Sequence, residues 1–186
     1  RRYSFVYGCP YRYYKNRLVL MKIEVDNPVL NSAVAALNSE AQPHFSAYVD
    51  RIVDYCIKNE NGKVFEDWDR ETLRQLVAYH QAKGTLIALA DDEANVQGVF
   101  MWYNCDSDDH WSFVYNWNED NKDGDAIFMA FLFASSTSAW KQMLLKFIER
   151  EPDCLTKTLL GVRHRKGNPT RVEYTTKLFS KILKAK

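Results

Sequence analysis

The spacing of apolar residues predicts two helices in the first half of the chain. A helix over residues 43–58 is indicated by apolar positions three and four apart, namely Phe45, Tyr48, Val49, Ile52, Val53 and Cys56. A second helix is expected to begin after Asp69, a good N-cap residue, and to end at Gly84, which tolerates a left-handed helix end. Its apolar face is expected to hold Leu73, Leu76, Val77 and His80. We therefore expect His80 to pack or to cap rather than to catalyse.

Apolar runs predict the strands. A first strand is expected over residues 17–25, where residues 26–28 act as a stop signal. Residues 85–90 and 96–103 are expected to form a hairpin, because a cluster of turn-forming residues separates them. Residues 126–133 are apolar at every position, which is typical of a central strand buried on both faces.

The C-terminal third predicts a strand–helix–strand unit followed by a short tail. A helix is expected after the hydroxyl cluster of residues 135–138, and it should end before Pro152. A strand is expected over residues 155–162, then a turn at 166–169 and a short extended segment at 171–174. Leu178, Phe179 and Ile182 suggest a terminal helix.

This order of elements predicts the fold class. The strands at 126–133 and 155–162 flank one helix, which favours a parallel pair with a right-handed crossover. The hairpin upstream is antiparallel, and residues 111–117 could pair as another strand. We therefore expect an α/β or α+β domain with a mixed, mainly antiparallel central sheet and flanking helices.

Composition indicates a folded domain with an unusual N-terminal segment. The chain has 186 residues, a suitable size for one domain, and 46% of them are apolar. Its aromatic share of 14% is typical of folded rather than disordered chains. Five tyrosines lie among basic residues in the first 16 positions. We expect an aromatic and basic arm at residues 1–16, which packs on its own domain or on a partner or stacks on bases, and a single domain at 17–186.

Charge is balanced in total but unevenly distributed. The chain carries 25 basic and 24 acidic residues, so its net charge of +1 gives no bulk attraction to nucleic acid or membranes. Residues 104–125 are mainly acidic, whereas residues 157–186 are mainly basic. The basic residues of this tail are Lys157, Arg163, Arg165, Lys166, Arg171, Lys177, Lys181, Lys184 and Lys186. They indicate either a patch for phosphate, nucleic acid or an acidic partner, or a solvated basic face.

Cysteine spacing and the absence of common motifs narrow the chemistry. Cys9, Cys56, Cys105 and Cys154 form no CxxC pair and no zinc-type cluster with histidine, so no metal site is predicted. A reducing compartment is favoured, with Cys56 as a buried thiol. No apolar run approaches the roughly 20 residues of a membrane span, and no secretory signal is visible. These features predict a cytoplasmic location. No Walker, dinucleotide-binding, HExxH or GxSxG motif occurs.

The element order over residues 17–165 resembles the GNAT (Gcn5-related N-acetyltransferase) superfamily. Residues 85–104 look like the second and third strands of that family, TLIALADDEANVQGVFMWYN, including its apolar V-x-G return at Val96-Gln97-Gly98. Residues 123–150 look like its fourth strand, cofactor loop and third helix, DGDAIFMAFLFASSTSAWKQMLLKFIER. The short C-terminus is similar to that of toxin-activating lysine acyltransferases and of small GNAT-like proteins of bacteriophages. The former also share a Gly-Asp turn, here Gly124-Asp125.

The resemblance implies transfer of an acyl group from acetyl-CoA or another acyl-CoA to an amine of a substrate or partner protein. It places pantetheine on the backbone of Phe131, Leu132 and Phe133 and the pyrophosphate at the following loop, Ala134, Ser135, Ser136, Thr137 and Ser138. Asp125 is the first candidate for the general base, and Tyr174 for the acid that protonates the leaving thiolate. The alternatives to these catalytic and binding roles are structural: Asp125 can be an ordinary turn residue, and residues 135–138 can be ordinary helix caps.

The chain departs from the family at two points. The family loop reads Q/R-x-x-G-x-G/A, whereas residues 134–138 hold no glycine. A helix N-terminus can nevertheless bind phosphate through its free N–H groups. The toxin-activating acyltransferases also use an N-terminal histidine, and here no histidine precedes His44.

Two other functions therefore remain open. The first is a GNAT-like scaffold without catalysis, such as a phage virion or host-interaction protein, which could assemble through its arm and its opposite charges. If the chain is phage-encoded, its location would be the host cytoplasm or the virion. The second is a nucleic-acid-binding module that uses the basic tail and the tyrosine-rich arm.

Overall fold

The computed structural model describes residues 11–14, 17–20, 28–60, 65, 68–107, 123–165, 168–174 and 179. Within these ranges the helices are α1 (Pro28–Leu37), α2 (Pro43–Asn59), α3 (Arg70–Lys83) and α4 (Thr137–Arg150), followed by the short 3-10 helix η1 (Pro152–Leu155).

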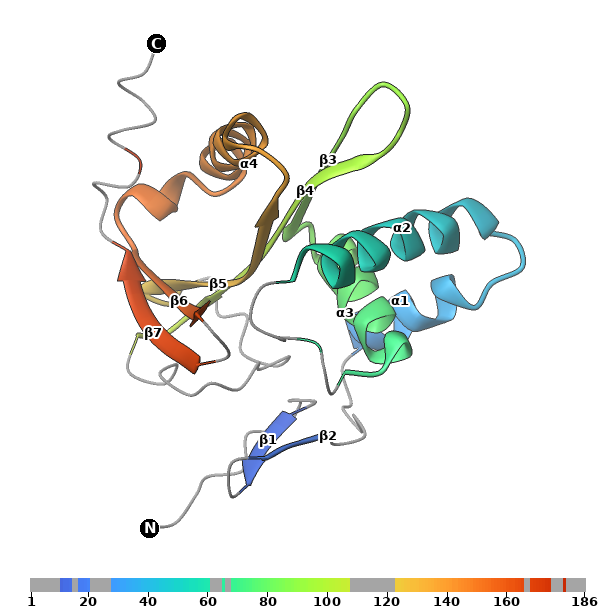
Figure 1. Ribbon diagram of the computed structural model, residues 1–186, viewed down its shortest axis with the longest axis horizontal. Coiled ribbons are helices and arrows are strands. Elements are labelled where there is room, and N and C mark those ends of the chain that lie inside the picture. Colours follow the sequence, from blue (N-terminus) through green and yellow to red (C-terminus); the bar gives the residue numbers. More distant parts are fainter. Residues whose placement is uncertain are drawn as a thin grey trace.

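A five-stranded sheet forms the centre of the fold (Figure 1). Its spatial order is β3 (Leu86–Ala90), β4 (Val96–Cys105), β5 (Ala126–Ala134), β6 (Thr158–Arg165) and β7 (Asn168–Tyr174). The β5–β6 pair is parallel, and the β3–β4, β4–β5 and β6–β7 pairs are antiparallel. The predicted mixed, mainly antiparallel sheet is therefore confirmed.

A separate two-stranded sheet lies near the N-terminus. Strand β1 (Tyr11–Tyr14) pairs antiparallel with β2 (Arg17–Leu20). The strand predicted over residues 17–25 thus begins where expected, but its described part pairs with residues of the arm and not with the five-stranded sheet.

The helices cover both faces of the central sheet. Helices α1, α2 and α3 lie on one face and α4 lies on the other (Figure 1). Successive residues of β4 alternate between the two layers: Val99 and Met101 join the α1–α3 core, whereas Phe100 and Trp102 join the α4 core. Strand β5 is likewise buried on both sides, as its continuous apolar sequence predicted.

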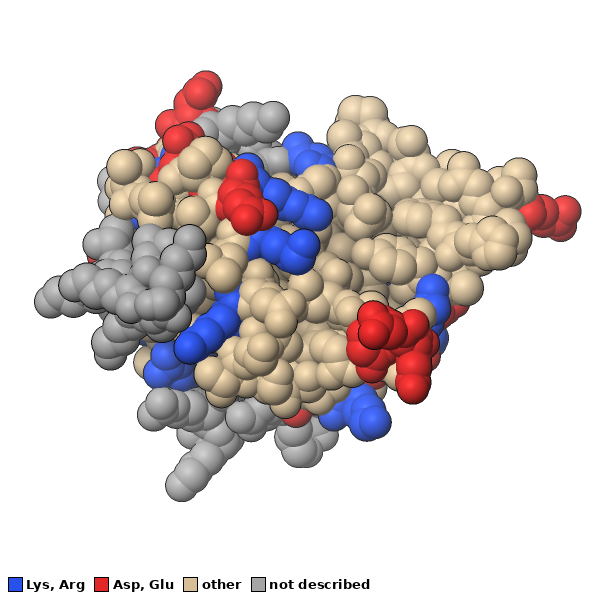
Figure 2. All heavy atoms as spheres, turned by 90° about the horizontal axis from the view of Figure 1, so that it is seen from above, with Lys and Arg blue, Asp and Glu red and all other residues tan. Residues whose placement is uncertain are grey.

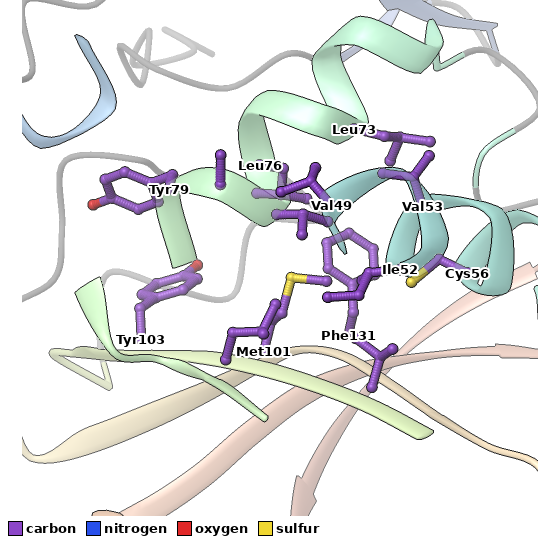
Figure 3. Packing of buried hydrophobic residues seen from close by; sticks show 14 of the residues in the cluster. Val49, Ile52, Val53, Cys56, Leu73, Leu76, Tyr79, Met101, Tyr103 and Phe131 are labelled. Atoms are coloured by element: carbon purple, nitrogen blue, oxygen red, sulfur yellow. The ribbon is translucent and has the colours of Figure 1, made fainter. Parts of the chain in front are cut away.

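The α1–α3 core depends on the two helices that the sequence predicted. Figure 3 shows side chains of α2 and α3 pointing toward β4 and β5. Val49, Ile52 and Val53 of α2 are fully buried, and the helix spans almost the predicted residues. Burial of such apolar area, at about 25 cal/mol per Å², is the main favourable contribution to folding.

Helix α3 begins and ends at the predicted residues. The Asp69 side chain accepts a hydrogen bond from the backbone N–H of Thr72 at 2.8 Å, and Gly84 adopts the left-handed conformation with φ of 73°. His80 lies fully buried on this helix, with Nδ1 2.8 Å from Oγ1 of Thr85. The prediction that His80 packs within this helix's buried face is confirmed.

Three predicted features differ from the structure. Pro28, interpreted as a stop signal, begins α1, because proline is well suited to the first position of a helix. Strand β6 begins at Thr158 rather than at residue 155, because η1 occupies the preceding residues. Pro169, predicted in a turn, lies in the edge strand β7, where its missing N–H need not interrupt the sheet.

Two further predictions fall largely outside the described residues. They are the possible strand at 111–117 and the terminal helix, of which only Phe179 is described. Phe179 is buried in the α4 core, with its ring centroid 6.3 Å from that of Phe147.

Candidate functional site

The central sheet opens between its two parallel strands. Strands β5 and β6 pair from Ala126 with Thr158 as far as Met129 with Gly161. Both strands continue beyond this point, but no further pairs form between them. The two strands therefore diverge toward their C-terminal ends, where ligands of open α/β sheets usually bind.

A bulge in β5 lies at the point of divergence. Met101 of β4 pairs with Phe131, whereas the next residue, Trp102, pairs with Met129. Ala130 is thus an extra residue in β5. Because a bulge bends its strand and increases the local twist, Ala130 explains why β5 turns away from β6 here.

The divergent strands enclose a groove of about 390 Å³. Its walls are residues 129–134 of β5 and residues 161–163 of β6, with Asn59 from α2 and Tyr174 from β7. The volume lies within the usual range of ligand sites, roughly 300–1,000 Å³. Phe131, Leu132, Phe133 and Ala134, which the sequence selected for the cofactor, and Tyr174, selected as an acid, all line it.

The groove also exposes backbone polar groups of β5. Strand β4 covers one edge of β5 through to Ala134, but β6 pairs with the other edge only as far as Met129. Backbone N–H and C=O groups of strands alternate between the two edges, and buried ones need partners. Beyond Met129 this edge of β5 therefore has no partner in β6, and an extended ligand has room to lie along it.

The loop after β5 is held by a second bulge. Leu89 pairs with Gly98 and Ala90 pairs with Val96, so Gln97 is left out of the β3–β4 ladder. Its carbonyl oxygen accepts from the Tyr55 hydroxyl and from the Ser135 backbone N–H, both at 2.9 Å. Tyr55 and Ser135 are therefore fixed to β4 by one backbone carbonyl.

The hydroxyl groups of the loop largely have protein partners. The Ser135 hydroxyl lies 2.8 Å from Oε1 of Gln97, and the Ser136 hydroxyl accepts from the Ala139 N–H at 3.1 Å. Ser136 is thus the N-cap of α4. Ser135, Ser136, Thr137 and Ser138 are exposed at this helix start and follow the groove, but none of them lines it.

Glycine lets two elements approach closely near the groove. A Cβ at Gly98 would lie 2.7 Å from Sδ of Met143, so α4 packs directly on the backbone of β4. A Cβ at Gly161 would lie 3.3 Å from the Tyr174 ring. Gly161 therefore leaves room for Tyr174 at the narrow end of the groove.

Asp125, the candidate base, lies elsewhere. It precedes β5 at the end where β5 and β6 are paired, and its backbone carbonyl accepts from the Thr158 N–H at 3.0 Å. Its carboxylate is exposed and accepts from the hydroxyl and the backbone N–H of Ser107, each at 2.7 Å. These hydrogen bonds lower the pKa of Asp125. Asp125 does not line the groove, whereas Tyr174 does.

Sequence reasoning did not assign six residues of the groove, namely Asn59, Met129, Ala130, Gly161, Val162 and Arg163. Asn59 ends a helix and bonds its own helix, donating from Nδ2 to the Tyr55 carbonyl at 2.9 Å. Gly161 lies within the strand predicted at 155–162, and Arg163 lies directly after it. Arg163 was counted only as part of the basic tail. Side chains alternate along β6, with Leu159 in the α4 core and Leu160 in the α1–α3 core. This alternation could have indicated on which face of the sheet Gly161 and Arg163 lie.

The thiols of Cys56 and Cys154 are poor nucleophiles. Both side chains are buried, as is that of Cys105. Burial raises the pKa of the Cys56 thiol to about 12 and is the main cause of a similar rise at Cys154. Since the thiolate is the reactive form, neither residue is suited to covalent catalysis.

The raised pKa of Cys56 predicts a loss of stability at alkaline pH. The folded value exceeds the unfolded value of 9.0, so the stabilisation is complete below about pH 9 and decreases as pH rises toward 12. Within that window we expect a loss of about 1 kcal/mol per pH unit from this thiol. Urea unfolding of the wild type and of Cys56→Ala at about pH 8 and about pH 10 measures it. Equal losses in both chains would contradict the prediction.

The predicted charge asymmetry involves mostly residues outside the described ranges. On the face in Figure 2, small groups of Lys and Arg and small groups of Asp and Glu lie side by side, and neither sign covers the face. Most of the acidic stretch lies in residues 108–122 and much of the basic tail in residues 166–167, 175–178 and 180–186, outside the described ranges.

Comparisons with known proteins give no family for this chain. No protein-family model, no curated protein and no solved structure matches it. Among the described residues, no group of three or more His, Cys, Asp or Glu side chains is placed to hold a metal ion. No helix in the same ranges has the length and apolar character needed to cross a membrane.

Proposed function

We propose that the chain is an N-acyltransferase that takes an acyl group from acyl-CoA and gives it to an amine. The observation that carries this proposal is the groove between β5 and β6, with its uncovered strand edge and a helix N-terminus beyond it. This arrangement agrees with the expectation from the resemblance to GNAT enzymes.

The pantetheine arm would lie along β5. Its two amide groups would bond the backbone at Phe131–Phe133 as an added strand does, while its methylene groups contact the apolar wall. Because the recognition uses main-chain groups, it does not require particular side chains at these positions.

The phosphates would lie at the N-terminus of α4. The hydroxyls of Ser135 and Ser136 already have partners, so the backbone N–H groups of Thr137 and Ser138 and the positive end of the helix would hold the anion. These N–H groups perform the role expected of a glycine-rich loop.

The reaction would occur near Tyr174. The amine nitrogen attacks the thioester carbonyl carbon, an N–C bond forms, and the C–S bond breaks. The Tyr174 hydroxyl gives its proton to the departing thiolate and regains one from water. Since no carboxylate lines the groove in the described part of the chain, we assign the amine proton to water and not to Asp125.

Titration calorimetry with CoA and with 3′,5′-ADP, which lacks the pantetheine arm, tests the proposal. We expect CoA to bind more tightly, because only CoA reaches the edge of β5. Release of free thiol from acetyl-CoA in the presence of simple amines then tests transfer. Absence of CoA binding at millimolar concentration would overturn the proposed function.

Two observations favour a second candidate, a scaffold without catalysis. The hydroxyls of Ser135 and Ser136 are occupied by the protein, and of the candidate acid and base only Tyr174 lines the groove. A scaffold of this fold would leave CoA unbound and would self-associate in light scattering at low salt. A monomer that binds CoA would exclude that candidate.

A further inference from the structure

Arg163 is the one charged side chain among the groove-lining residues of the described ranges. It is exposed, and no carboxylate of the described residues forms an ion pair with it. Its guanidinium carbon lies 5.9 Å from the centroid of the Tyr174 ring, within the range of cation–π contacts. The groove therefore holds a positive charge beside Tyr174 without a described counter-charge.

The surroundings of Arg163 favour an anion in the groove. Arginine remains protonated at all ordinary pH values, and its planar fork fits the two oxygens of a carboxylate. The opposite wall is formed by residues 129–134 of β5, all of which are apolar. Apolar walls strengthen the attraction between opposite charges.

The position of Arg163 distinguishes this anion from the phosphates of CoA. Along β6, which runs parallel to β5, Arg163 lies two residues beyond Gly161, the last residue that pairs with β5. Its guanidinium reaches back toward the Tyr174 ring. The N-cap of α4, Ser136, is five residues beyond Phe131, or roughly 16 Å along an extended chain. Arg163 thus lies near the reacting carbonyl rather than near the phosphates.

We infer that Arg163 is a specificity-determining residue that binds a carboxylate close to the reacting carbonyl, an inference that depends on the proposed function. The carboxylate can be carried by the acyl group, as in succinyl-CoA, or by the acceptor, as in an amino acid. Both sources present the same chemistry to the guanidinium.

Two experiments distinguish the sources. In the first, calorimetry gives the ratio of the dissociation constants of acetyl-CoA and succinyl-CoA. In the second, thiol release from acetyl-CoA gives the ratio of rates with β-alanine and β-alaninamide as acceptors. Each ratio is compared between the wild type and Arg163→Gln, so that differences in the amine pKa of the two acceptors cancel.

We expect Arg163→Gln to reduce the preference for the carboxylate about tenfold or more in one of the two experiments, which identifies the source. Arg171→Gln is the matched control: it removes the same charge from β7, and Arg171 does not line the groove. This control should keep the wild-type ratios.

Unchanged ratios in Arg163→Gln, in a chain that still binds CoA, would overturn this inference and leave the proposed function intact. An equal loss of preference in Arg171→Gln would also overturn it, since a general effect of net charge would then explain the result. Failure of the wild type to bind CoA would overturn both.

Discussion

Replacing Phe147 by Ala is expected to lower the free energy of unfolding by about 3–5 kcal/mol. The side chain is fully buried on α4, and its ring centroid lies 4.8 Å from that of Phe100 and 5.0 Å from that of Trp102. Truncation removes these contacts and leaves a cavity between the helix and the sheet. Because domains are stable by only about 5–15 kcal/mol, the loss is a large part of the total.

Urea unfolding followed by tryptophan fluorescence measures this loss. Leu145→Ala is the control on the same helix, since Leu145 is 39% exposed and should cost about 1 kcal/mol or less. Equal losses for the two variants would show that α4 does not pack on β4 as described.

Replacing Ala134 by Trp is expected to weaken CoA binding about tenfold to a hundredfold. Ala134 is half-buried at the open end of β5 and lines the groove. An indole here would occupy the path of the pantetheine arm, and moving it aside would cost about 1–3 kcal/mol.

Calorimetry on Ala90→Trp provides the matched control. Ala90 also ends a strand, β3, but it is exposed and does not line the groove. That variant should bind CoA as the wild type does, and both variants should unfold cooperatively. Wild-type affinity in Ala134→Trp would place the ligand outside the β5–β6 groove.

The helices with one strongly periodic apolar face could be predicted from sequence. Helix α3 carries its own boundary signals, a capping aspartate and a left-handed glycine, and these depend on local geometry alone. Helix α1 was missed because Pro28 was interpreted as an end rather than a beginning. Its buried Leu30, Ala33 and Leu37 do follow helical spacing.

The groove could be predicted only in part. An apolar run such as β5 indicates a buried strand, but the point where it leaves β6 depends on pairing between distant segments. Tyr174 reaches the groove because β7 folds back on β6 and places it opposite Leu159. Asp125 was selected for its closeness in sequence to β5, but the sequence did not indicate that β5 and β6 separate only after Met129, away from Asp125.

Because Ala130 is an extra residue in β5, the width of the groove depends on the number of residues in that strand. Substitutions along the wall can change which molecule fits while the gap itself persists. Removing Ala130 would instead restore regular pairing with β4 and leave each later side chain on its present face, because Met129 and Phe131 already belong to opposite cores. A deletion at Ala130 would therefore remove the bend that separates β5 from β6, whereas changes of side chain would leave that bend in place.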